Sequence, residues 1–175
     1  MIRLVFVLTV ICAVSSALLA AVYTITKEPI ALAKEQSKRL AAAHVMPAGL
    51  PEPEKVTVEG ETFFICQVDG EIVAAAVVGR SQNGYGGLIE LMVGISDGKL
   101  VGYEVVSATE TPGLGTKIAG DAFKKPLMGK ALTSNWTLKK NGGDVDAVTA
   151  ATISSRAAIE CITDAIAKLE LLGKR

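Results

Sequence analysis

The sequence predicts an α+β protein, in which one N-terminal transmembrane helix precedes a compact domain of antiparallel hairpins and packed helices. Three observations support this fold: an uncharged apolar run from Leu4 to Ile25, two Asp-Gly pairs between apolar runs, and an amphipathic stretch near the C-terminal end. We expect residues 1–26 to form the membrane anchor, residues 27–55 a helical, proline-rich linker, and residues 56–175 the compact domain.

The anchor is predicted from length and charge. The 22 residues from Leu4 to Ile25 would form a helix of about 33 Å, which is enough to cross a hydrocarbon core. A cleaved signal peptide is the alternative, but its apolar part usually has only about 7–15 residues. Lipidation of Cys12 is disfavoured, because a lipidated cysteine normally follows a small residue and Ile11 is bulky. We expect a helix over Lys27–Ala43, continuing past a kink at Pro29, and then an irregular segment over Met46–Glu54.

The hairpins are predicted from their turns. Asp-Gly between apolar runs favours a tight turn, because both positions accept a positive φ. Asp69-Gly70 and Asp97-Gly98 are such pairs, and Gly84–Gly87 separates the two hairpins as a flexible or tightly turning segment. The paired strands are expected over Phe63–Val68 with Ile72–Val78, and over Leu91–Ile95 with Leu100–Val106.

The last third alternates loops and helices. We expect a short helix over Ala119–Met128, a strand over Thr133–Lys139 and a long helix over Ile153–Leu172 that ends at Gly173. In the long helix one face is apolar and one row is polar. The apolar face holds Ile159, Ile162, Ile166 and Leu169, and the polar row holds Glu160, Asp164 and Lys168.

The composition limits the function. The chain has 18 basic and 18 acidic residues, which gives no reason to expect a nucleic-acid partner. Its three cysteines are far apart and it has one histidine, so we expect no metal site. Buried free thiols are expected at Cys66 and Cys161, and a disulfide between them stays open outside the cytoplasm.

A glycine-containing loop follows the second predicted hairpin. It reads Glu110-Thr-Pro-Gly-Leu-Gly-Thr-Lys-Ile118. Its glycines let backbone N–H groups approach a ligand closely, and its hydroxyls and Lys117 could meet polar or anionic atoms. The loop has neither the P-loop spacing nor the dinucleotide-binding spacing. Taken by itself, it favours a structural turn.

A hydroxyl-rich segment, Asp146–Ser155, precedes the long helix. Helix N-termini present free N–H groups and the positive end of the helix dipole, which favours a bound phosphate there. The alternative is helix capping by Asp146, Thr149 or Thr152. The residues alone favour capping.

Together, the two segments resemble the FMN-binding domains of two related proteins, the G subunit of Rnf-type electron transport complexes and the C subunit of sodium-pumping NADH:quinone reductase. Asp146-x-x-Thr149-Ala150-Ala151-Thr152 is similar to the flavinylation motif of that family, Asp-x-x-Ser/Thr-Gly-Ala-Thr. Gly84–Gly87, the strand Leu91–Ile95 and the single N-terminal membrane helix also match. The resemblance covers nearly the whole chain and is closer to the Rnf protein.

By this resemblance, Thr152 is joined to the phosphate of FMN by a phosphoester bond. A separate flavin transferase that uses FAD and a magnesium ion is expected to make the bond, because an unaided threonine hydroxyl is a poor nucleophile. Asp146 is expected to serve transferase recognition or to cap the helix. The other expected cofactor-binding residues are Glu110, Thr111, Leu114, Gly115, Thr116, Lys117, Thr149, Ala150, Ala151, Ile153 and Ser154.

The chain departs from the family pattern at two positions. Ala150 stands where the motif usually has glycine, and it would be strained if that position needs a positive φ. Ala108 stands where the family often has a histidine, which argues against a proton-relaying imidazole.

The resemblance implies a membrane-anchored electron-transfer subunit with covalent FMN, within a complex that couples ferredoxin and NAD electron transfer to ion translocation. Its expected partners are the other membrane subunits. We expect no catalytic residues and no turnover by the chain alone. The alternatives are an anchored module that binds flavin noncovalently and a standalone flavin-dependent reductase, which would turn over by itself with a simple donor.

Membrane topology gives conflicting predictions. Arg3 precedes the anchor and four basic residues follow it, so the positive-inside rule places the compact domain in the cytoplasm. The family places the flavin domain on the periplasmic or extracellular side of the bacterial inner (cell) membrane, and we follow the family. The four basic residues are Lys27, Lys34, Lys38 and Arg39.

Overall fold

The computed structural model describes residues 2–172 and divides into two compact units, Met1–Ser37 and Lys38–Arg175. Helix α1 (Ile2–Val45) forms the first unit and begins the second. It continues through Pro29, which confirms the predicted helix over Lys27–Ala43. By length and composition α1 could cross a membrane, and its apolar window is not buried.

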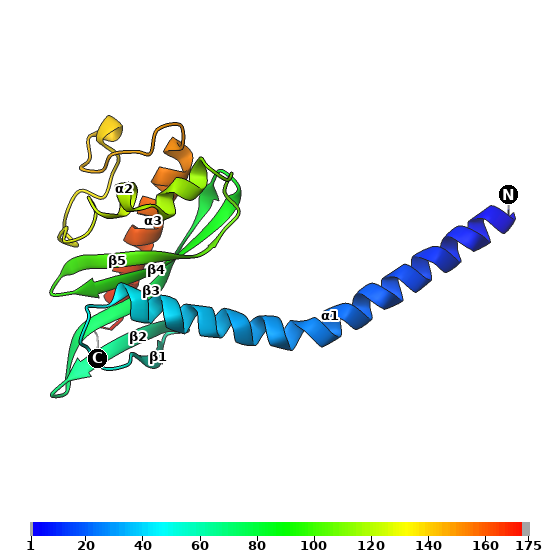
Figure 1. Cartoon of the computed structure of the whole chain (residues 1–175), viewed down its shortest axis with the longest axis horizontal. Coiled ribbons are helices and arrows are strands. Elements are labelled where there is room, and N and C mark those ends of the chain that lie inside the picture. Colours follow the sequence, from blue (N-terminus) through cyan, green and yellow to red (C-terminus); the bar gives the residue numbers. More distant parts are fainter. Residues whose placement is uncertain (1, 173–175) are drawn as a thin grey trace. The chain divides into compact units, whose positions relative to one another are not determined.

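The second unit is built on one antiparallel sheet in which each strand pairs with the next along the chain (Figure 1). The strands are β1 (Glu54–Val58), β2 (Glu61–Val68), β3 (Glu71–Gly84), β4 (Gly87–Ser96) and β5 (Lys99–Ala108).

The turns of this sheet follow the predicted chemistry. Asp69-Gly70 and Asp97-Gly98 have φ values of 52° and 85°, and of 51° and 67°, and they join β2 to β3 and β4 to β5. Gly84 pairs with Gly87 across a tight turn that joins β3 to β4, so the two hairpins form one continuous meander. Strand β1 was not predicted from the sequence, and neither was its turn at Glu59-Gly60, where both φ values are again positive.

Helix α3 (Thr152–Leu169) covers one face of the sheet. Ile159 and Ile162 on its predicted apolar face are buried in the larger core cluster. Its backbone lies very close to β3, because a β-carbon at Gly79 would overlap the carbonyl group of Cys161. The end of the helix predicted at Gly173 lies outside the described residues.

The polar row of α3 runs along β3. Glu160 accepts a hydrogen bond from the hydroxyl of Ser81 at 2.6 Å. Asp164 accepts one from the backbone N–H of Arg80 at 2.8 Å, and Lys168 donates to the carbonyl of Val78 at 3.0 Å. These bonds fix the rotation of α3 about its own axis, so they also position the first turn of the helix.

The opposite face of the sheet is covered by the C-terminal end of α1. Ala42 and Val45 pack there with Phe64 and Cys66 of β2. Cys161 belongs to the core cluster on the α3 face. The two thiols therefore lie on opposite faces of the sheet, and both are free.

Two predictions for the segment between β5 and α3 are wrong. The expected helix over Ala119–Met128 is a single turn, α2 (Asp121–Lys124). It does not continue because Pro126 has no backbone N–H to donate to the preceding turn, and the N–H of Leu127 donates to the carbonyl of Lys124 instead. The expected strand over Thr133–Lys139 consists of turns and one isolated bridge from Leu138 to Val145. There, local hydrogen bonds replace a strand ladder: the Asn135 side chain donates to the carbonyl of Gly142 and accepts from the Thr137 hydroxyl. Two short 3-10 helices, η1 (Gly115–Ala119) and η2 (Lys139–Asn141), complete the segment.

Candidate functional site

The glycine loop (Glu110–Ile118) follows β5 and is held together by hydrogen bonds between its own residues. The carbonyl of Thr111 accepts hydrogen bonds from the backbone N–H groups of Leu114 at 3.2 Å and Thr116 at 3.4 Å. The hydroxyl of Thr116 accepts from the N–H of Gly113 at 3.0 Å. The hydroxyl of Tyr103 donates to the carbonyl of Ile118 and holds the far end of the loop against the sheet. These hydrogen bonds hold the loop in a closed shape.

A second tight turn leads into α3. The N–H of Ala151 donates to the carbonyl of Val148 at 3.0 Å. The buried hydroxyl of Ser155 accepts from the N–H of Val148 at 2.9 Å and donates to the carbonyl of Ala151 at 2.8 Å. Within this turn Ala150 has a φ of 63°, which is the strained conformation expected from its departure from the family motif.

Among residues 2–172, no side chain caps the start of α3. The residue before the helix is Ala151, and the structure shows no side-chain hydrogen bond at this cap. The exposed carboxylate of Asp146 instead pairs with Lys139 at 2.7 Å. The capping alternative for Asp146, Thr149 and Thr152 is therefore wrong. Since the first N–H groups of a helix have no intrahelical partner, this end of α3 can receive an anion.

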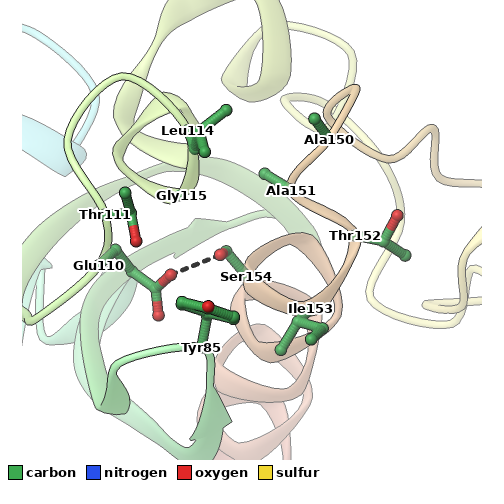
Figure 2. A pocket seen from close by; sticks show the side chains of 10 residues that line it. All are labelled: Tyr85, Glu110, Thr111, Leu114, Gly115, Ala150, Ala151, Thr152, Ile153 and Ser154. Carbon is green, nitrogen blue, oxygen red and sulfur yellow. Dashed lines mark hydrogen bonds between the residues drawn. The ribbon is translucent and has the colours of Figure 1, made fainter.

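A pocket of about 410 Å³ lies between the glycine loop, the β3–β4 turn and the start of α3 (Figure 2). Its volume is in the range of small-molecule sites. It is lined by Tyr85, Glu110, Thr111, Leu114, Gly115, Ala150, Ala151, Thr152, Ile153 and Ser154.

The pocket brings together nine of the residues predicted from the sequence, from segments far apart in the chain. The other four predicted residues, Thr116, Lys117, Asp146 and Thr149, are not among its lining residues. Tyr85 was missed, although the match of Gly84–Gly87 to the family pattern was a signal for it. Ser155 was also missed, and its role in the turn had no signal in the sequence.

Glu110 joins the three walls of the pocket. Its carboxyl group accepts a hydrogen bond from the hydroxyl of Ser154 at 2.5 Å, and one from the N–H of Gly86 at 3.2 Å. The residue is 6% exposed. A β-carbon at Gly115 would overlap the carboxyl oxygen Oε2 and crowd the Ser154 hydroxyl, so a larger residue there would displace this pair.

Three hydroxyl groups lie in the first turn of α3, and two of them have protein partners. Ser154 donates to Glu110, and Ser155 bridges Val148 and Ala151. The hydroxyl of Thr152 makes no hydrogen bond to any of residues 2–172, and the residue is half-buried. Figure 2 shows its side chain directed away from the Glu110–Ser154 pair.

The mouth of the pocket is apolar. Tyr85, Leu114 and Ile153 are 70%, 42% and 47% exposed, and they come from three different segments. Exposed apolar side chains that gather at one pocket are typical of ligand or partner sites. The pocket therefore combines an apolar mouth and a helix start that can receive an anion, and in the first turn of that helix the Thr152 hydroxyl is the one without a hydrogen-bond partner among residues 2–172.

Known proteins of similar sequence show the family of this chain. Residues 84–167 match the FMN-binding domain family. The chain is 33% identical over 162 residues to the G subunit of the proton-translocating ferredoxin:NAD(+) oxidoreductase complex of Clostridium ljungdahlii, covering 91% of this chain and 86% of that protein. The chain belongs to the family of G subunits of ion-translocating oxidoreductase complexes.

Other members of this G-subunit family are similar over most of their length. The protein of Methanosarcina acetivorans is 33% identical over 173 residues, covering 94% of this chain and 92% of that protein. The protein of Pseudoalteromonas atlantica is 32% identical over 176 residues, covering 89% and 82%. These matches confirm the family resemblance seen in the sequence.

The fold is shared with a solved structure. The C subunit of the Na(+)-translocating NADH-quinone reductase of Parabacteroides distasonis superposes with a TM-score of 0.57 at 16% identity, covering 81% of this chain and 93% of that protein. This similarity confirms the α+β fold predicted for this chain. Every residue that lines the pocket lies within the part matched by the FMN-binding domain family.

Proposed function

We propose that this chain is a membrane-anchored electron carrier that holds FMN through a phosphoester bond to Thr152. The observation that carries the proposal is the unengaged hydroxyl of Thr152 at the first residue of α3, on the rim of the pocket. Its neighbours Ser154 and Ser155 are committed to protein partners, so they are poor candidates for modification. We retain residues 1–26 as the anchor, 27–55 as the linker and 56–175 as the FMN-binding domain.

The residues present fit the phosphate and the ring of FMN. The N–H groups and the dipole at the start of α3 would stabilise a phosphate attached to Thr152. The apolar side chains of Tyr85, Leu114 and Ile153 would cover part of the ring. The flavin would supply the electron chemistry, and the chain would hold it and set its surroundings.

The remaining predicted site residues receive different roles. Thr116 would shape the glycine loop, because its hydroxyl is already bound inside it. Lys117 and Thr149 are exposed in the two pocket segments and stay proposed contacts of the cofactor. Asp146 pairs with Lys139 and is exposed, so it stays a proposed contact for the transferase.

Attachment would be a substitution at phosphorus. The hydroxyl oxygen of Thr152 would bond to the phosphorus in the FMN half of FAD, AMP would leave, and the hydroxyl proton would pass to a base. Among the described residues, none is hydrogen-bonded to this hydroxyl and could act as the base. We therefore assign the base and the magnesium ion to a separate flavin transferase.

The setting would be a membrane complex of several subunits. The Clostridium relative is named as part of a proton-translocating ferredoxin:NAD(+) oxidoreductase. We propose that this chain likewise relays electrons between the membrane subunits of a complex that couples ferredoxin and NAD electron transfer to ion movement. Its flavin domain would lie on the periplasmic or extracellular side.

The covalent bond is tested on denaturing gels viewed under ultraviolet light, with the full chain coexpressed with a flavin transferase. We expect fluorescence that survives denaturation, is lost in Thr152→Ala and is kept in Thr149→Ala. Retained fluorescence in Thr152→Ala would refute the assignment. Flavin that leaves on denaturation of the wild-type chain would support noncovalent binding instead.

The side of the membrane is tested by adding a protease to intact spheroplasts. A domain outside the cytoplasm is digested before lysis, together with its covalent flavin fluorescence. Protection until lysis would favour the cytoplasmic side, as the basic residues after the anchor predict.

A further inference from the structure

The buried carboxylate of Glu110 does more than fill space. Both of its hydrogen-bond partners donate: the Ser154 hydroxyl to one oxygen and the Gly86 N–H to the other. A carboxyl group whose two oxygens both accept matches the ionised form, because a protonated group needs an acceptor for its own proton. Hydrogen bonds to a charged acceptor are stronger than neutral ones and offset the cost of burying the charge.

The surrounding backbone is fitted to this carboxylate. A β-carbon at Gly84 would lie 2.6 Å from the Glu110 Oε1 atom, and one at Gly115 would overlap Oε2. The β3–β4 turn and the glycine loop therefore both lack side chains where the carboxylate lies. Its position relative to Ser154, on the helix that carries Thr152, is fixed from three directions.

The lining residues of the pocket include no basic side chain that could pair with this charge. Among its ten lining residues, Glu110 is the only acidic or basic side chain. The mouth residues Tyr85, Leu114 and Ile153 would exclude water from a filled pocket. A charge in such surroundings acts on a neighbouring charge more strongly than it does in water.

We propose that Glu110 is a positioning residue that locks the three walls of the pocket together and keeps a negative charge beside the flavin, which lowers the midpoint potential of the flavin. The inference rests on the proposed function, since it concerns the flavin held at Thr152. Reduction adds negative charge to the ring, and a fixed carboxylate in the same pocket opposes that change. A neutral side chain of the same shape would oppose it less.

The test measures the midpoint potential of the covalently bound flavin in the full chain in detergent. Glu110→Gln keeps the shape and removes the charge, so we expect the potential to rise. Ser154→Ala keeps the carboxylate of Glu110 but removes the hydrogen bond that holds it in place. For this variant we expect a smaller rise in the midpoint potential and a lower thermal unfolding midpoint of the flavin-free chain. Glu110→Asp keeps the charge, so of the three pocket variants its midpoint potential should lie closest to that of the wild-type chain. Glu71→Gln is the matched control, because it removes an exposed carboxylate outside the lining residues.

The possible outcomes separate the two proposals. If the wild-type chain carries covalent flavin and Glu110→Gln has the same midpoint potential, the role of Glu110 is overturned while the flavin bond to Thr152 is not. A wild-type chain without covalent flavin overturns both. If Glu110→Gln does not fold, Ser154→Ala decides: an unchanged potential overturns the proposal, and a raised one supports it.

Discussion

The backbone N–H of Val148 donates to the hydroxyl of Ser155 across 2.9 Å, and this bond closes the turn that presents Thr152. The same hydroxyl donates to the carbonyl of Ala151 at 2.8 Å. One buried side chain therefore holds both ends of the segment in which Ala150 is strained. The geometry of the proposed flavin site depends on a residue outside the pocket itself.

Ser155→Ala should lower the free energy of unfolding by about 1–3 kcal/mol, because it leaves the N–H of Val148 without its acceptor. Urea denaturation of the full chain in detergent measures the change. The control is Thr149→Ala, an exposed side chain in the same segment, for which we expect a change within about 0.5 kcal/mol. Equal losses in the two variants would contradict the role given to Ser155.

Ala150→Gly should stabilise the chain. A left-handed conformation costs an L-residue roughly 1–2 kcal/mol, and glycine returns part of this gain through its freer unfolded state. We expect a net gain of about 0.5–1 kcal/mol, measured by the same denaturation. Ala147→Gly is the matched control: Ala147 is not among the positive-φ residues, so glycine should destabilise there. A loss of stability in Ala150→Gly would contradict the strain at this position.

Local patterns predicted the strands and the long helix well. The Asp-Gly turns could be predicted locally, since both residues accept the positive φ values that such a turn needs, and the apolar runs on either side of each turn become the paired strands. Helix α3 carries its own apolar face. Strand β1 was missed because its turn, Glu59-Gly60, is a weaker signal than Asp-Gly, and because its residues are mostly exposed.

The site was predicted only in part, because much of it consists of long-range contacts. Glu110 and Ser154 are 44 positions apart, and nothing in either segment alone indicates that they meet. Tyr85 comes from a third segment. The Asp146–Lys139 pair shows the converse: the residues suggested a cap, but the side chain has a nearby cation as its partner.

The buried thiol of Cys161 should make stability fall at high pH. Burial, with smaller contributions from Asp164 and Glu160, raises the pKa of this thiol from 9.0 to about 12. The folded chain therefore keeps a proton that the unfolded chain releases near pH 9, so this contribution to stability is complete below pH 9 and is lost as the pH rises toward 12.

Urea midpoints at about pH 8 and about pH 10.5, on either side of the ordinary thiol pKa, test this contribution in the wild-type chain and in Cys161→Ala. We expect the wild-type chain to lose more stability between the two pH values. Burial also raises the pKa of Tyr103, but both chains share that residue, so it cancels in the comparison. Equal losses would show that the thiol titrates alike in the folded and unfolded chains.

Gly79→Ala should strongly destabilise the domain. The added β-carbon would overlap the carbonyl of Cys161, which is backbone and cannot move unless α3 moves away from the sheet. We expect a loss of about 3 kcal/mol or more, measured by urea denaturation. Because α3 carries Thr152 and Ser154, the covalent flavin content should fall in the same variant.

Gly102→Ala is the matched control for this substitution. It also lies in a strand, but the nearest atom to an added β-carbon is the Met128 Cε at 3.9 Å. Alanine fits there without strain and should be neutral or stabilising by up to about 1 kcal/mol. If both glycine variants lost the same stability, the close approach of α3 to β3 would not be what requires glycine at position 79. A selective loss in Gly79→Ala would instead show that the site depends on the distance between the backbones of α3 and β3.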